Sequence, residues 1–448
     1  MSGPMTTSAV IRDPALPGLE TAMRGEIAPC LSAALGAASN GEWSLLSATP
    51  VRFRYRPGKR AIVQYTLTFL GLKGEFSTPA ALWFFAGGKA AKLARKVTFQ
   101  GLDNSAPPPA VLDPATGGLL QIFPYDYKVP QLAAFLREPG AYAPDLLGAA
   151  ADPADAPELV RFRPGLGATF RWRRPGGPQV YVKIYPGANS ADALVRLESL
   201  HRAAPPAGFA TPRVVGSAEK IAAIAVEGIE GPYFGGILAT GRIPEIQDAA
   251  QRAARALAGL HRCRVAVSSE IDRGAFVQRA TAAATSIGTI CPTQGKAARH
   301  LAGWITRTTA PLRLSLTHMD VKPEHLIVTD DAITLLDVDN MARSDSLYDV
   351  AMLEMRIHSA FAAGNCKREQ AKAAIRALLE AYSSPGDPGF TRRYTWLRAC
   401  AALQVAKHYA QNPSDRWREC TAKLLHAGRP DIQPNRANPA TAFGEGSA

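Results

Sequence analysis

The first part of the chain alternates apolar and polar residues with the period of β-strands. The run "VRFRYRPGKRAIVQYTLTF" (51–69) holds two β-rich stretches separated by Arg56-Pro57-Gly58, which is typical of a strand–turn–strand hairpin. A third apolar run, "AALWFF", follows, then a helix-like stretch, "GGKAAKLARKV", and a last strand-like run, "GGLLQIFPYD". This order predicts a small lobe of the form strand–strand–strand–helix–strand.

The same order of patterns returns further along the chain. The segment "LVRFRPGLGATFRWRRPGGPQVYVKIYPGANSADALVRLESLHRA" predicts two turns, three strands and a helix, and "KIAAIAVEGIEG" supplies another apolar strand. Placing Arg56-Pro57-Gly58 on Arg163-Pro164-Gly165 gives an offset of 107 residues, and placing "LWFFAGG" on "VKIYPG" gives an offset of 100. We predict an internal duplication of one lobe, with two unrelated β-rich segments as the alternative.

From Ile243 onward the apolar residues recur with helical spacing. The segment "IPEIQDAAQRAARALAGLHR" predicts a helix with Pro244 in its first turn. Its predicted buried face consists of Ile246, Ala249, Ala250, Ala253, Leu257 and Leu260. Three more helices are expected in "LYDVAMLEMRIHSAFAAG", "KREQAKAAIRALLEAYS" and "YTWLRACAALQVAKHYAQ".

These patterns divide the chain into five predicted parts. They are a short helical leader (1–42), a first β-rich lobe (43–150), a second β-rich lobe (158–232), a mainly helical region (233–429) and a disordered tail (430–448). The segment "REPGAYAPDLLGAAADPADAPE", rich in Ala, Pro and Asp, is expected to link the two lobes.

Composition and charge narrow the class of protein. Hydrophobic residues make up 47% of the 448 residues and charged residues 20%, so a large core is expected, and disorder is not expected for most of the chain. The formal net charge of +13 favours anionic ligands such as nucleotides. No tight Lys/Arg run with interleaved aromatic residues occurs, so a nucleic-acid partner is not indicated.

The cysteines and the apolar runs bear on where the protein works. The six cysteines are far apart and form no CxxC pair, which indicates neither a zinc site nor a disulfide framework. No signal-peptide core and no stretch of the length of a membrane span is found. We therefore expect reduced thiols, a cytoplasmic location and no membrane partner. The oligomeric state is left open.

One stretch, "LTHMDVKPEHLIVTDDAITLLDVDN" (316–340), carries the candidate chemistry. Asp320 follows a strand-like run, and two short strands joined by a Thr-Asp-Asp turn bring His325 and Asp337 to the same end. The result is one free carboxylate beside two candidate metal ligands. Phosphoryl transfer needs such a set, because one carboxylate orients the acceptor hydroxyl while others hold Mg²⁺ on the phosphates.

The stretch also resembles a known family. "HMDVKPEH" is similar to the catalytic loop of kinases, and more closely to that of the aminoglycoside phosphotransferase and choline kinase family, whose later Ile-Asp and Gly-Asp-Pro-x-Tyr-Asp motifs correspond to "LLDVD" and "SDSLYDVA". The resemblance covers roughly residues 158–425. It implies an α+β, bilobal protein-kinase-like fold, with a duplicated, degenerate N-terminal β-rich lobe and a mainly helical C-terminal lobe.

The resemblance implies a role for each residue of the motif. Asp320 would be the catalytic base, Lys322 would contact the transferring phosphate, and Asp337 would be the main Mg²⁺ ligand. A plain solvated lysine is the alternative for Lys322. Asp349 would brace the loop, and His318 is expected to be packed and hydrogen-bonded rather than reactive.

His325 departs from the family pattern, which has asparagine at this metal-ligand position. A nitrogen ligand favours Mn²⁺ over Mg²⁺, and an imidazole binds metal only when it is unprotonated. We therefore expect a kinase that works with Mg²⁺, prefers Mn²⁺ and loses rate below a pH of roughly 6.5. The alternative is that Asp337 and Asp339 hold the metal while His325 contacts a phosphate or water.

The resemblance places the nucleotide on the second β-rich lobe. Gly165 and Gly167 resemble a glycine-rich loop, and Lys183 in "VYVKIY" resembles the strand lysine that pairs with the α and β phosphates of ATP. Glu198 is the expected ion-pair partner of Lys183, with Asp192 as the alternative. The backbone of Glu227, Gly228 and Ile229, preceded by Val226, would read the adenine.

The first lobe lacks the corresponding lysine. Trp83 stands at the position of Lys183, so this lobe is expected to be a non-catalytic copy that packs on, or shields, the working lobe. The sequence thus predicts an ATP-dependent small-molecule kinase. The alternative is a pseudokinase that binds a nucleotide or acts as a scaffold.

The acceptor is described only by its class. The family implies a hydroxyl on a sugar, an amino alcohol or an aminoglycoside-like molecule. The basic chain argues mildly against polycationic aminoglycosides, although a local acidic pocket at Asp339 and Glu354 would reverse that argument.

Overall fold

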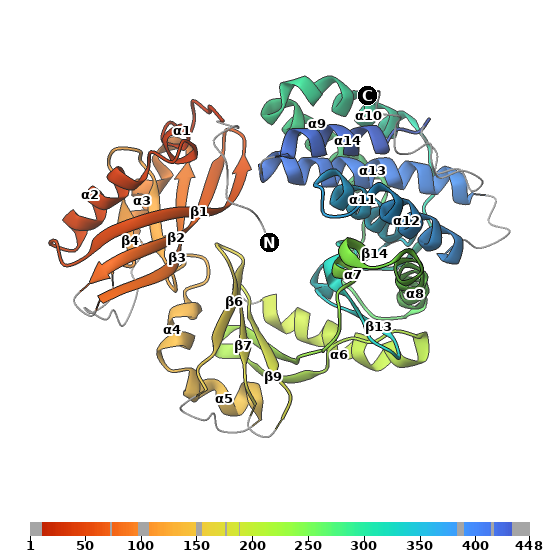
Figure 1. Ribbon diagram of the computed structural model, residues 1–448, viewed down its shortest axis with the longest axis horizontal. Coiled ribbons are helices and arrows are strands. Elements are labelled where there is room, and N and C mark those ends of the chain that lie inside the picture. The colour runs from red at the N-terminus through yellow and green to blue at the C-terminus, as the bar shows by residue number, and fades with distance from the viewer. Residues whose placement is uncertain are drawn as a thin grey trace. The chain divides into compact units, whose positions relative to one another are not determined.

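The computed structural model describes residues 11–71, 74–96, 107–148, 155–174, 177–187, 189–382, 389–413 and 416–431 (Figure 1). The chain forms two compact units. The first consists of residues 1–191, 215–227 and 411–415, and the second of residues 192–214, 228–410 and 416–448. The predicted disordered tail lies almost wholly outside the described residues.

The first unit contains two five-stranded sheets. One sheet is formed by β1 (Ser44–Arg56), β2 (Arg60–Gly71), β3 (Gly74–Phe85), β4 (Ala110–Leu112) and β5 (Leu119–Ile122), in the order β1-β2-β3-β5-β4. The other is formed by β6 (Glu158–Arg163), β7 (Gly167–Trp172), β8 (Val180–Ile184), β9 (Val214–Ala218) and β10 (Ala223–Glu227), in the order β6-β7-β8-β10-β9.

The two sheets agree in strand order, register and turn structure. Ile62 pairs with Trp83 in the first sheet, and Thr169 pairs with Lys183 at the matching position of the second. A helix follows the third strand of each sheet: α3 (Lys89–Lys96) in the first and α6 (Asn189–Ala207) in the second. The register thus places Trp83 at the position of Lys183. That the sheets arose by duplication stays a prediction.

Each Arg-Pro-Gly turn is held by an aspartate from earlier in the chain. The Gly58 N–H donates to Asp13 Oδ2 at 2.8 Å, and the Gly165 N–H donates to Asp126 Oδ2 at 2.5 Å. Both glycines have a positive φ, 62° and 70°, which a residue with a side chain rarely adopts. The same turn chemistry therefore closes the first hairpin of both sheets.

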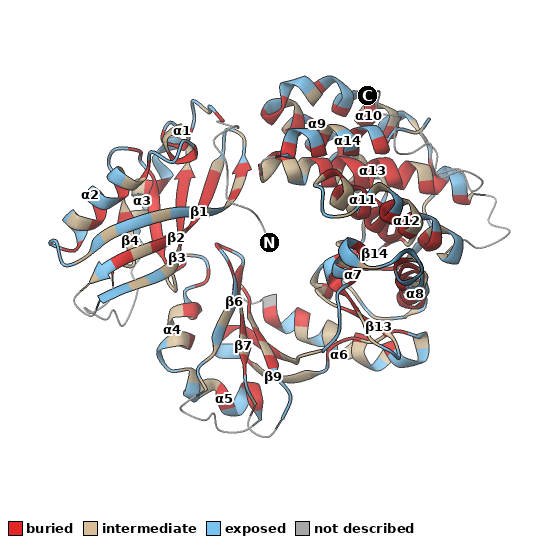
Figure 2. Ribbon diagram, viewed as in Figure 1, coloured by how far each residue is buried: buried red, intermediate tan, exposed pale blue. Residues whose placement is uncertain are grey.

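Helices cover both faces of the first sheet. The helices α1 (Leu19–Met23) and α2 (Ala28–Ala38) correspond to the predicted leader, and the Tyr65 hydroxyl donates to the carbonyl of Ala22 in α1. On the opposite face, α3 packs Ala90 against a cluster that contains Trp83 and Leu119. Figure 2 shows buried residues along β2 and β3.

The second sheet is covered by helices from the segment between the two sheets. The helices α4 (Gln131–Arg137) and α5 (Pro139–Leu147) pack Phe135 and Leu146 against Phe170 and Val182. Because α5 lies in the segment expected to be a linker, the first part of that segment is a helix rather than a simple connector. Its apolar residues recur at helical spacing and bury against the sheet.

The first sheet also covers the free edge of the second. The strand β6 is an edge strand, and edge carbonyls need partners. The Gln64 side chain donates to the carbonyl of Phe162 at 3.3 Å, and Arg54 Nη2 donates to the carbonyl of Pro164 at 2.7 Å. Trp83 is so close to Gly165 that a Cβ on that glycine would lie 2.8 Å from the indole ring. The expectation that the first lobe packs on the second agrees with these contacts.

The second unit is mainly helical. It contains α6 from Asp192 onward. Its other helices are α7 (Phe234–Thr240), α8 (Ile243–Arg262), α9 (Arg273–Ile290), α10 (Pro292–Arg307), α11 (Leu347–Ala362), α12 (Arg368–Tyr382), α13 (Phe390–Gln411) and α14 (Trp417–Ala427). The six residues predicted for the apolar face of α8 are all buried, so this prediction is confirmed. The fold class is α+β, with two β-sheets followed by a helical region, as predicted.

Two further observations concern predictions made from composition. None of the helices in the described part of the chain is long and apolar enough to cross a membrane. All six cysteines are free thiols, in agreement with the prediction of no disulfide framework.

The burial of Trp83 leads to a stability prediction. Its side chain is fully buried between β2, α3 and the Gly165 turn, so Trp83→Ala should lower the free energy of unfolding by about 3–5 kcal/mol. Urea denaturation of both proteins would measure the loss. Leu46→Ala is the control, because Leu46 lies in the same sheet and is 51% exposed. A Trp83→Ala protein as stable as this control would contradict the assignment of Trp83 to the core.

Candidate active site

The candidate catalytic loop connects two pairs of short strands in the second unit. The strands β11 (Leu314–Thr317) and β14 (Ala342–Asp345) form one pair, and β12 (Leu326–Val328) and β13 (Ile333–Leu335) form the other. The strands β11, β12 and β13 agree with the strands predicted around the motif, whereas β14 was not predicted. The loop of residues 318–325 therefore enters from one strand pair and leaves into the other.

A buried carboxylate holds the start of this loop. Asp349, in the first turn of α11, is fully buried and accepts hydrogen bonds from the backbone N–H groups of His318 at 2.7 Å and Met319 at 2.9 Å. His261 Nε2 lies 3.0 Å from the same carboxylate. Met319 has a φ of 69°, a strained conformation for a residue with a long side chain. Asp349 thus braces the loop, as the sequence suggested.

His318 occupies a structural position. Its side chain is fully buried, and its Nε2 lies 3.0 Å from the carbonyl oxygen of Leu336, just before Asp337. This arrangement agrees with the expectation of a packed, hydrogen-bonded histidine.

Asp320 lies between two cations. Its side chain is one-third exposed, with Arg356 Nη2 at 3.5 Å from Oδ1 and Lys322 Nζ at 3.8 Å from Oδ2. Lys322 therefore contacts the candidate base; its contact with the transferring phosphate stays a prediction, with a plain solvated lysine as the alternative.

Arg356 was not found from the sequence. It lies on α11, two helical turns after Asp349, and therefore on the same face of the helix as Asp349. This face is turned toward the loop. Its side chain is 17% exposed. The seven-residue spacing from Asp349 was the available signal, but many surface arginines share such a spacing.

His325 and Asp337 form a close pair. The His325 Nε2 and Asp337 Oδ2 atoms are 3.3 Å apart, and the histidine is buried whereas Asp337 is partly exposed. Asp337 has a φ of 56°, in the left-handed region that aspartate tolerates better than most residues. The two predicted metal ligands are therefore brought together.

The environment of His325 bears on the predicted pH dependence. Burial lowers the pKa of His325, Lys322 adds to this effect, and Asp337 opposes it; together they bring this pKa to about 2. Burial therefore favours the neutral imidazole, the form that binds a metal. The loss of rate below a pH of roughly 6.5 was predicted from the pKa of an exposed imidazole, which this environment does not favour, and it stays a prediction.

The spacing of His325 and Asp337 suits two neighbouring ligands of a divalent ion. Neighbouring ligands at about 2.1 Å from one octahedral ion lie about 3 Å apart, which agrees with the separation of the two side-chain atoms. Within the described residues, no group of three or more His, Cys, Asp or Glu side chains suited to a metal ion is found. Water and phosphate oxygens would have to supply the remaining ligands, as is usual for Mg²⁺ in phosphoryl transfer.

Glu354 is unsuited to an acidic acceptor pocket. It is fully buried and paired with Arg398 at 2.9 Å and with the Tyr394 hydroxyl. Burial raises the pKa of Glu354, but Arg398, His358 and Tyr394 together outweigh burial, and the pKa falls to about 2. The possibility of an acidic pocket that includes Glu354 is therefore corrected: this carboxylate is neutralised inside the helical region.

The predicted nucleotide-binding residues occupy the second sheet and the segment after it. Lys183 lies on the central strand β8, between Thr169 of β7 and Ile224 of β10, and its ammonium group is 5.0 Å from the centre of the Tyr185 ring. Glu198 is at an exposed position of α6, in the other compact unit. The predicted Lys183–Glu198 ion pair stays a prediction.

The predicted hinge coincides with the boundary of the two units. Glu227 is the last residue of β10 and of the first unit in this region, and Gly228 and Ile229 begin the next stretch of the second. A hinge requires the chain to pass from one compact unit to another, and the chain does so at this point.

Gly165 and Gly167, the glycines of the predicted phosphate loop, are both buried and have a positive φ. A Cβ on Gly167, whose φ is 113°, would lie 2.0 Å from the Ile184 carbonyl oxygen. The N–H of Gly165 is already donated to Asp126, so this amide is satisfied within the protein. Its role as a phosphate ligand stays a prediction that requires Asp126 to be displaced.

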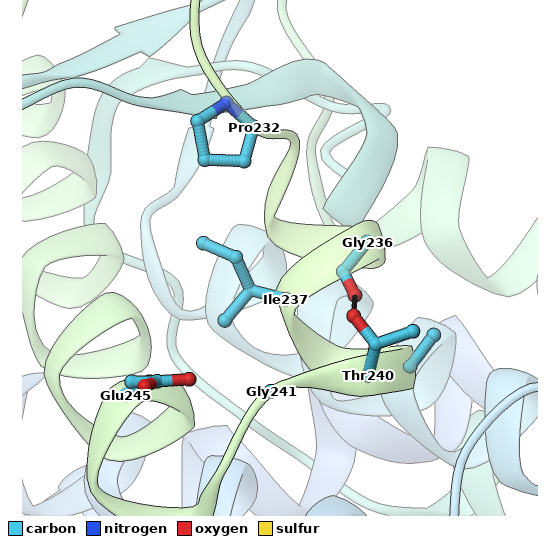
Figure 3. Close-up of a pocket in the computed structure, with 7 residues that line it drawn as sticks. Pro232, Gly236, Ile237, Thr240, Gly241 and Glu245 are labelled. Carbon is cyan, nitrogen blue, oxygen red and sulfur yellow. Dashed lines mark hydrogen bonds between the residues drawn. The ribbon is translucent and has the colours of Figure 1, made fainter.

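A pocket opens beside the start of α7 and α8 (Figure 3). It has a volume of about 540 Å³ and is lined by residues that include Pro232, Ile237 and Glu245. The Thr240 hydroxyl on its wall donates to the carbonyl of Gly236 at 3.1 Å. None of the predicted site residues lines this pocket, so it adds no support to their roles.

Comparison with solved structures finds kinases of small molecules. An aminoglycoside-3'-phosphotransferase of type VIII is 20% identical (TM-score 0.41), covering 56% of this chain and 94% of that one. A choline/ethanolamine kinase family protein from Mesorhizobium loti is 17% identical (TM-score 0.42), covering 68% and 98%. A macrolide 2'-phosphotransferase from Brachybacterium faecium is 19% identical (TM-score 0.43), covering 65% and 97%.

Comparison of the sequence with models of protein families identifies the family of this chain. No curated protein matches the chain. The family described as "Phosphotransferase enzyme family" matches residues 158–395, which is more than half of the chain and includes the second sheet, the candidate loop and Asp349. The predicted family is thereby confirmed: this chain belongs to the aminoglycoside phosphotransferase-type family of phosphotransferases.

Proposed function

We propose that this protein transfers the γ-phosphoryl group of ATP to a hydroxyl of a small molecule, such as a sugar, an amino alcohol or an aminoglycoside-like compound. The observation that carries the proposal is the braced loop of the second unit. There Lys322 and Arg356 contact Asp320, and the same two cations act on His325, which pairs with Asp337. A base and a metal-binding pair thus share one neighbourhood.

Each residue of the loop has a role in this proposal. Asp320 accepts a hydrogen bond from the acceptor hydroxyl and takes its proton as the new oxygen–phosphorus bond forms; the bond between the γ-phosphorus and the β–γ bridging oxygen of ATP breaks, and ADP leaves. Arg356 keeps Asp320 in place, and Lys322 reaches from Asp320 toward the transferring phosphate. Asp337 and His325 would hold a divalent ion, Mg²⁺ or Mn²⁺, which would neutralise phosphate charge.

The nucleotide roles are proposed for the second sheet and the hinge. Lys183 would pair with the α and β phosphates, with Glu198 as its partner and Asp192 as the alternative. Gly165 and Gly167 would shape the loop over the phosphates. The backbone of Glu227, Gly228 and Ile229 would contact the adenine.

The alternative function is a pseudokinase that binds a nucleotide or serves as a scaffold. Two observations favour it: a histidine stands at the asparagine position of the loop, and Asp126 occupies the Gly165 amide. Incubation with ATP, Mg²⁺ and a metabolite library, followed by mass spectrometry, separates the two. New phosphorylated products support the kinase, whereas ATP binding without any product supports the pseudokinase.

Asp320→Asn tests the proposed base. The amide keeps the shape of the side chain but accepts no proton, so the turnover rate should fall by roughly 10²-fold or more while ATP affinity stays nearly unchanged. Product formation and nucleotide binding would be measured on the same preparations. Asp331→Asn, an exposed carboxylate in the β12–β13 turn, is the control and should keep full activity. Activity of Asp320→Asn within a few-fold of the wild type would exclude Asp320 as the base.

Lys183→Ala tests the nucleotide side. Removing the ammonium group leaves the phosphates without a direct cationic partner on β8, so ATP affinity should fall by about 10-fold or more. Calorimetric titration with a non-hydrolysable ATP analogue measures it. Lys220→Ala, an exposed lysine beside β10, is the control. If both variants bind the analogue equally well, the nucleotide does not bind at Lys183.

His325→Asn tests the metal assignment. An asparagine offers a neutral oxygen in place of the imidazole nitrogen, so the variant should stay active and shift its preference from Mn²⁺ toward Mg²⁺. Rates over a range of concentrations of each ion would show the shift, with His300→Asn, an exposed histidine on α10, as the control. Identical metal curves for the wild type and His325→Asn would show that His325 is no ligand.

A further inference from the structure

The side chain of Arg356 is largely buried beside the candidate base, and most of its hydrogen-bond donors lack a partner. It is 17% exposed, and its Nη2 reaches Asp320 Oδ1 only at 3.5 Å, the outer limit of a hydrogen bond. Its Nε is buried and has no hydrogen-bond partner among the described residues. A guanidinium group carries five N–H donors, and buried donors are costly when they lack acceptors. A bound ligand with acceptor oxygens would supply what the protein leaves out.

The acids nearest to Arg356 along its own helix are already engaged. Asp349 accepts the N–H groups at the start of the loop, and Glu354 is paired with Arg398 inside the helical region. Within the part of the chain that the structure describes, Asp320 is the one carboxylate within 4.0 Å of the Arg356 guanidinium group. The protein therefore offers Arg356 a single, distant acid.

The two cations at Asp320 contact different oxygens of its carboxylate. Arg356 Nη2 lies 3.5 Å from Oδ1, and Lys322 Nζ lies 3.8 Å from Oδ2. Lys322 belongs to the loop that leads to His325 and Asp337, the pair proposed to hold the metal ion on the phosphates. Arg356 comes from α11 and meets the other oxygen. Two cations thus share one carboxylate, and the cation from α11 is not needed for the phosphate.

The wall next to Arg356 is made of hydroxyl groups. One helical turn further on the same face of α11, the hydroxyl oxygens of Ser359 and Tyr409 are 2.7 Å apart. Glu324, the remaining acid of the loop, lies beside α7, because a Cβ on Gly235 would be 3.5 Å from Glu324 Oε1. Hydroxyl groups, unlike carboxylates, offer no opposing charge to a cationic acceptor.

We propose that the acceptor of this phosphotransferase carries an acid group, a carboxylate or a phosphate, which Arg356 binds while Asp320 orients the hydroxyl. The inference rests on the proposed function, because it assigns Arg356 to the acceptor of that reaction. A guanidinium group binds carboxylate and phosphate oxygens through two parallel hydrogen bonds. Arg356 is thus a specificity-determining residue as well as a partner of Asp320.

The geometry also limits the size of the acceptor. Its hydroxyl lies within hydrogen-bond distance of Asp320 and its acid group within hydrogen-bond distance of Arg356, and these two side chains are 3.5 Å apart. The hydroxyl and the acid group are therefore at most about 10 Å apart, the span of a sugar acid or a small hydroxy acid. An amino alcohol or an aminoglycoside would place a positive charge against Arg356, which disfavours it.

Matched acceptors that differ mainly in their acid group test the proposed class. The protein is assayed with ATP and Mg²⁺ on glucuronate against glucose, and on glycerate and glycerol phosphate against glycerol, with choline and kanamycin as cationic acceptors. Each acceptor found in a metabolite library is added with its neutral counterpart. The kcat/KM of the acid member should be at least about 10-fold higher. Glycerate and glycerol phosphate show which acid group is preferred.

Arg356→Gln tests the residue. The KM of the acid acceptor should rise by about 10-fold or more, while the KM values of ATP and of the neutral member change less than about two-fold. Losing the contact with Asp320 lowers kcat for both members alike, so the ratio between them isolates the binding role. Arg356→Lys keeps the charge without the two parallel hydrogen bonds and should recover part of the loss.

Arg376→Gln, an exposed arginine on α12, is the matched control and should behave as the wild type. The melting temperature of each variant is recorded, so that a loss of folding is not mistaken for a loss of acceptor binding.

Four results would overturn the inference, and they differ in what they leave standing. Neutral or cationic acceptors that react as fast as acids would leave the proposed kinase intact. An equal fall of kcat for both members in Arg356→Gln, with unchanged KM, would limit Arg356 to positioning Asp320. A raised KM of ATP with every acceptor would assign Arg356 to the transferring phosphate. No product from any acceptor, although ATP binds, would overturn the proposed function as well.

Discussion

The candidate active site depends on one buried carboxylate. Asp349 is fully buried, and a charge in such a place is costly unless it is hydrogen-bonded. Its partners are the backbone N–H groups of His318 and Met319 together with His261, so the cost of burial is offset only when the loop adopts this conformation. The strained φ of Met319 is maintained by the same contacts. The position of Asp320 therefore follows from a group that never meets the substrate.

Charge balance around the loop depends on burial as much as on residue type. Asp320 lies beside Arg356 and Lys322, and the same two cations act on the buried His325. Since burial already disfavours a charged imidazole, His325 is neutral and has a nitrogen lone pair available for a metal. The departure from asparagine thus changes the ligand atom without adding a charge that would repel the ion.

The first sheet supports the second in two physical ways. Its side chains satisfy the free carbonyls of the edge strand β6, which would otherwise be open to pairing with another chain. Asp126, which follows the first sheet, holds the Gly165 turn as Asp13 holds the Gly58 turn. The segment between the sheets then covers the back of the second sheet with α4 and α5. The first sheet, with the buried Trp83 at the position of Lys183, thus packs against and supports its neighbour.

The sequence by itself determined the features that depend on local patterns. Alternation predicted the strands, the Arg-Pro-Gly turns predicted the hairpins, helical spacing predicted the buried face of α8, and the loop motif predicted the family. The tertiary structure decided the contacts between distant residues. Arg356 reaches Asp320 across 36 positions, and Asp126 reaches Gly165 across 39. It also decided that His325 is neutral and that Glu354 is paired with Arg398. No local pattern contains these facts, because burial and partner charges arise only when the chain has folded.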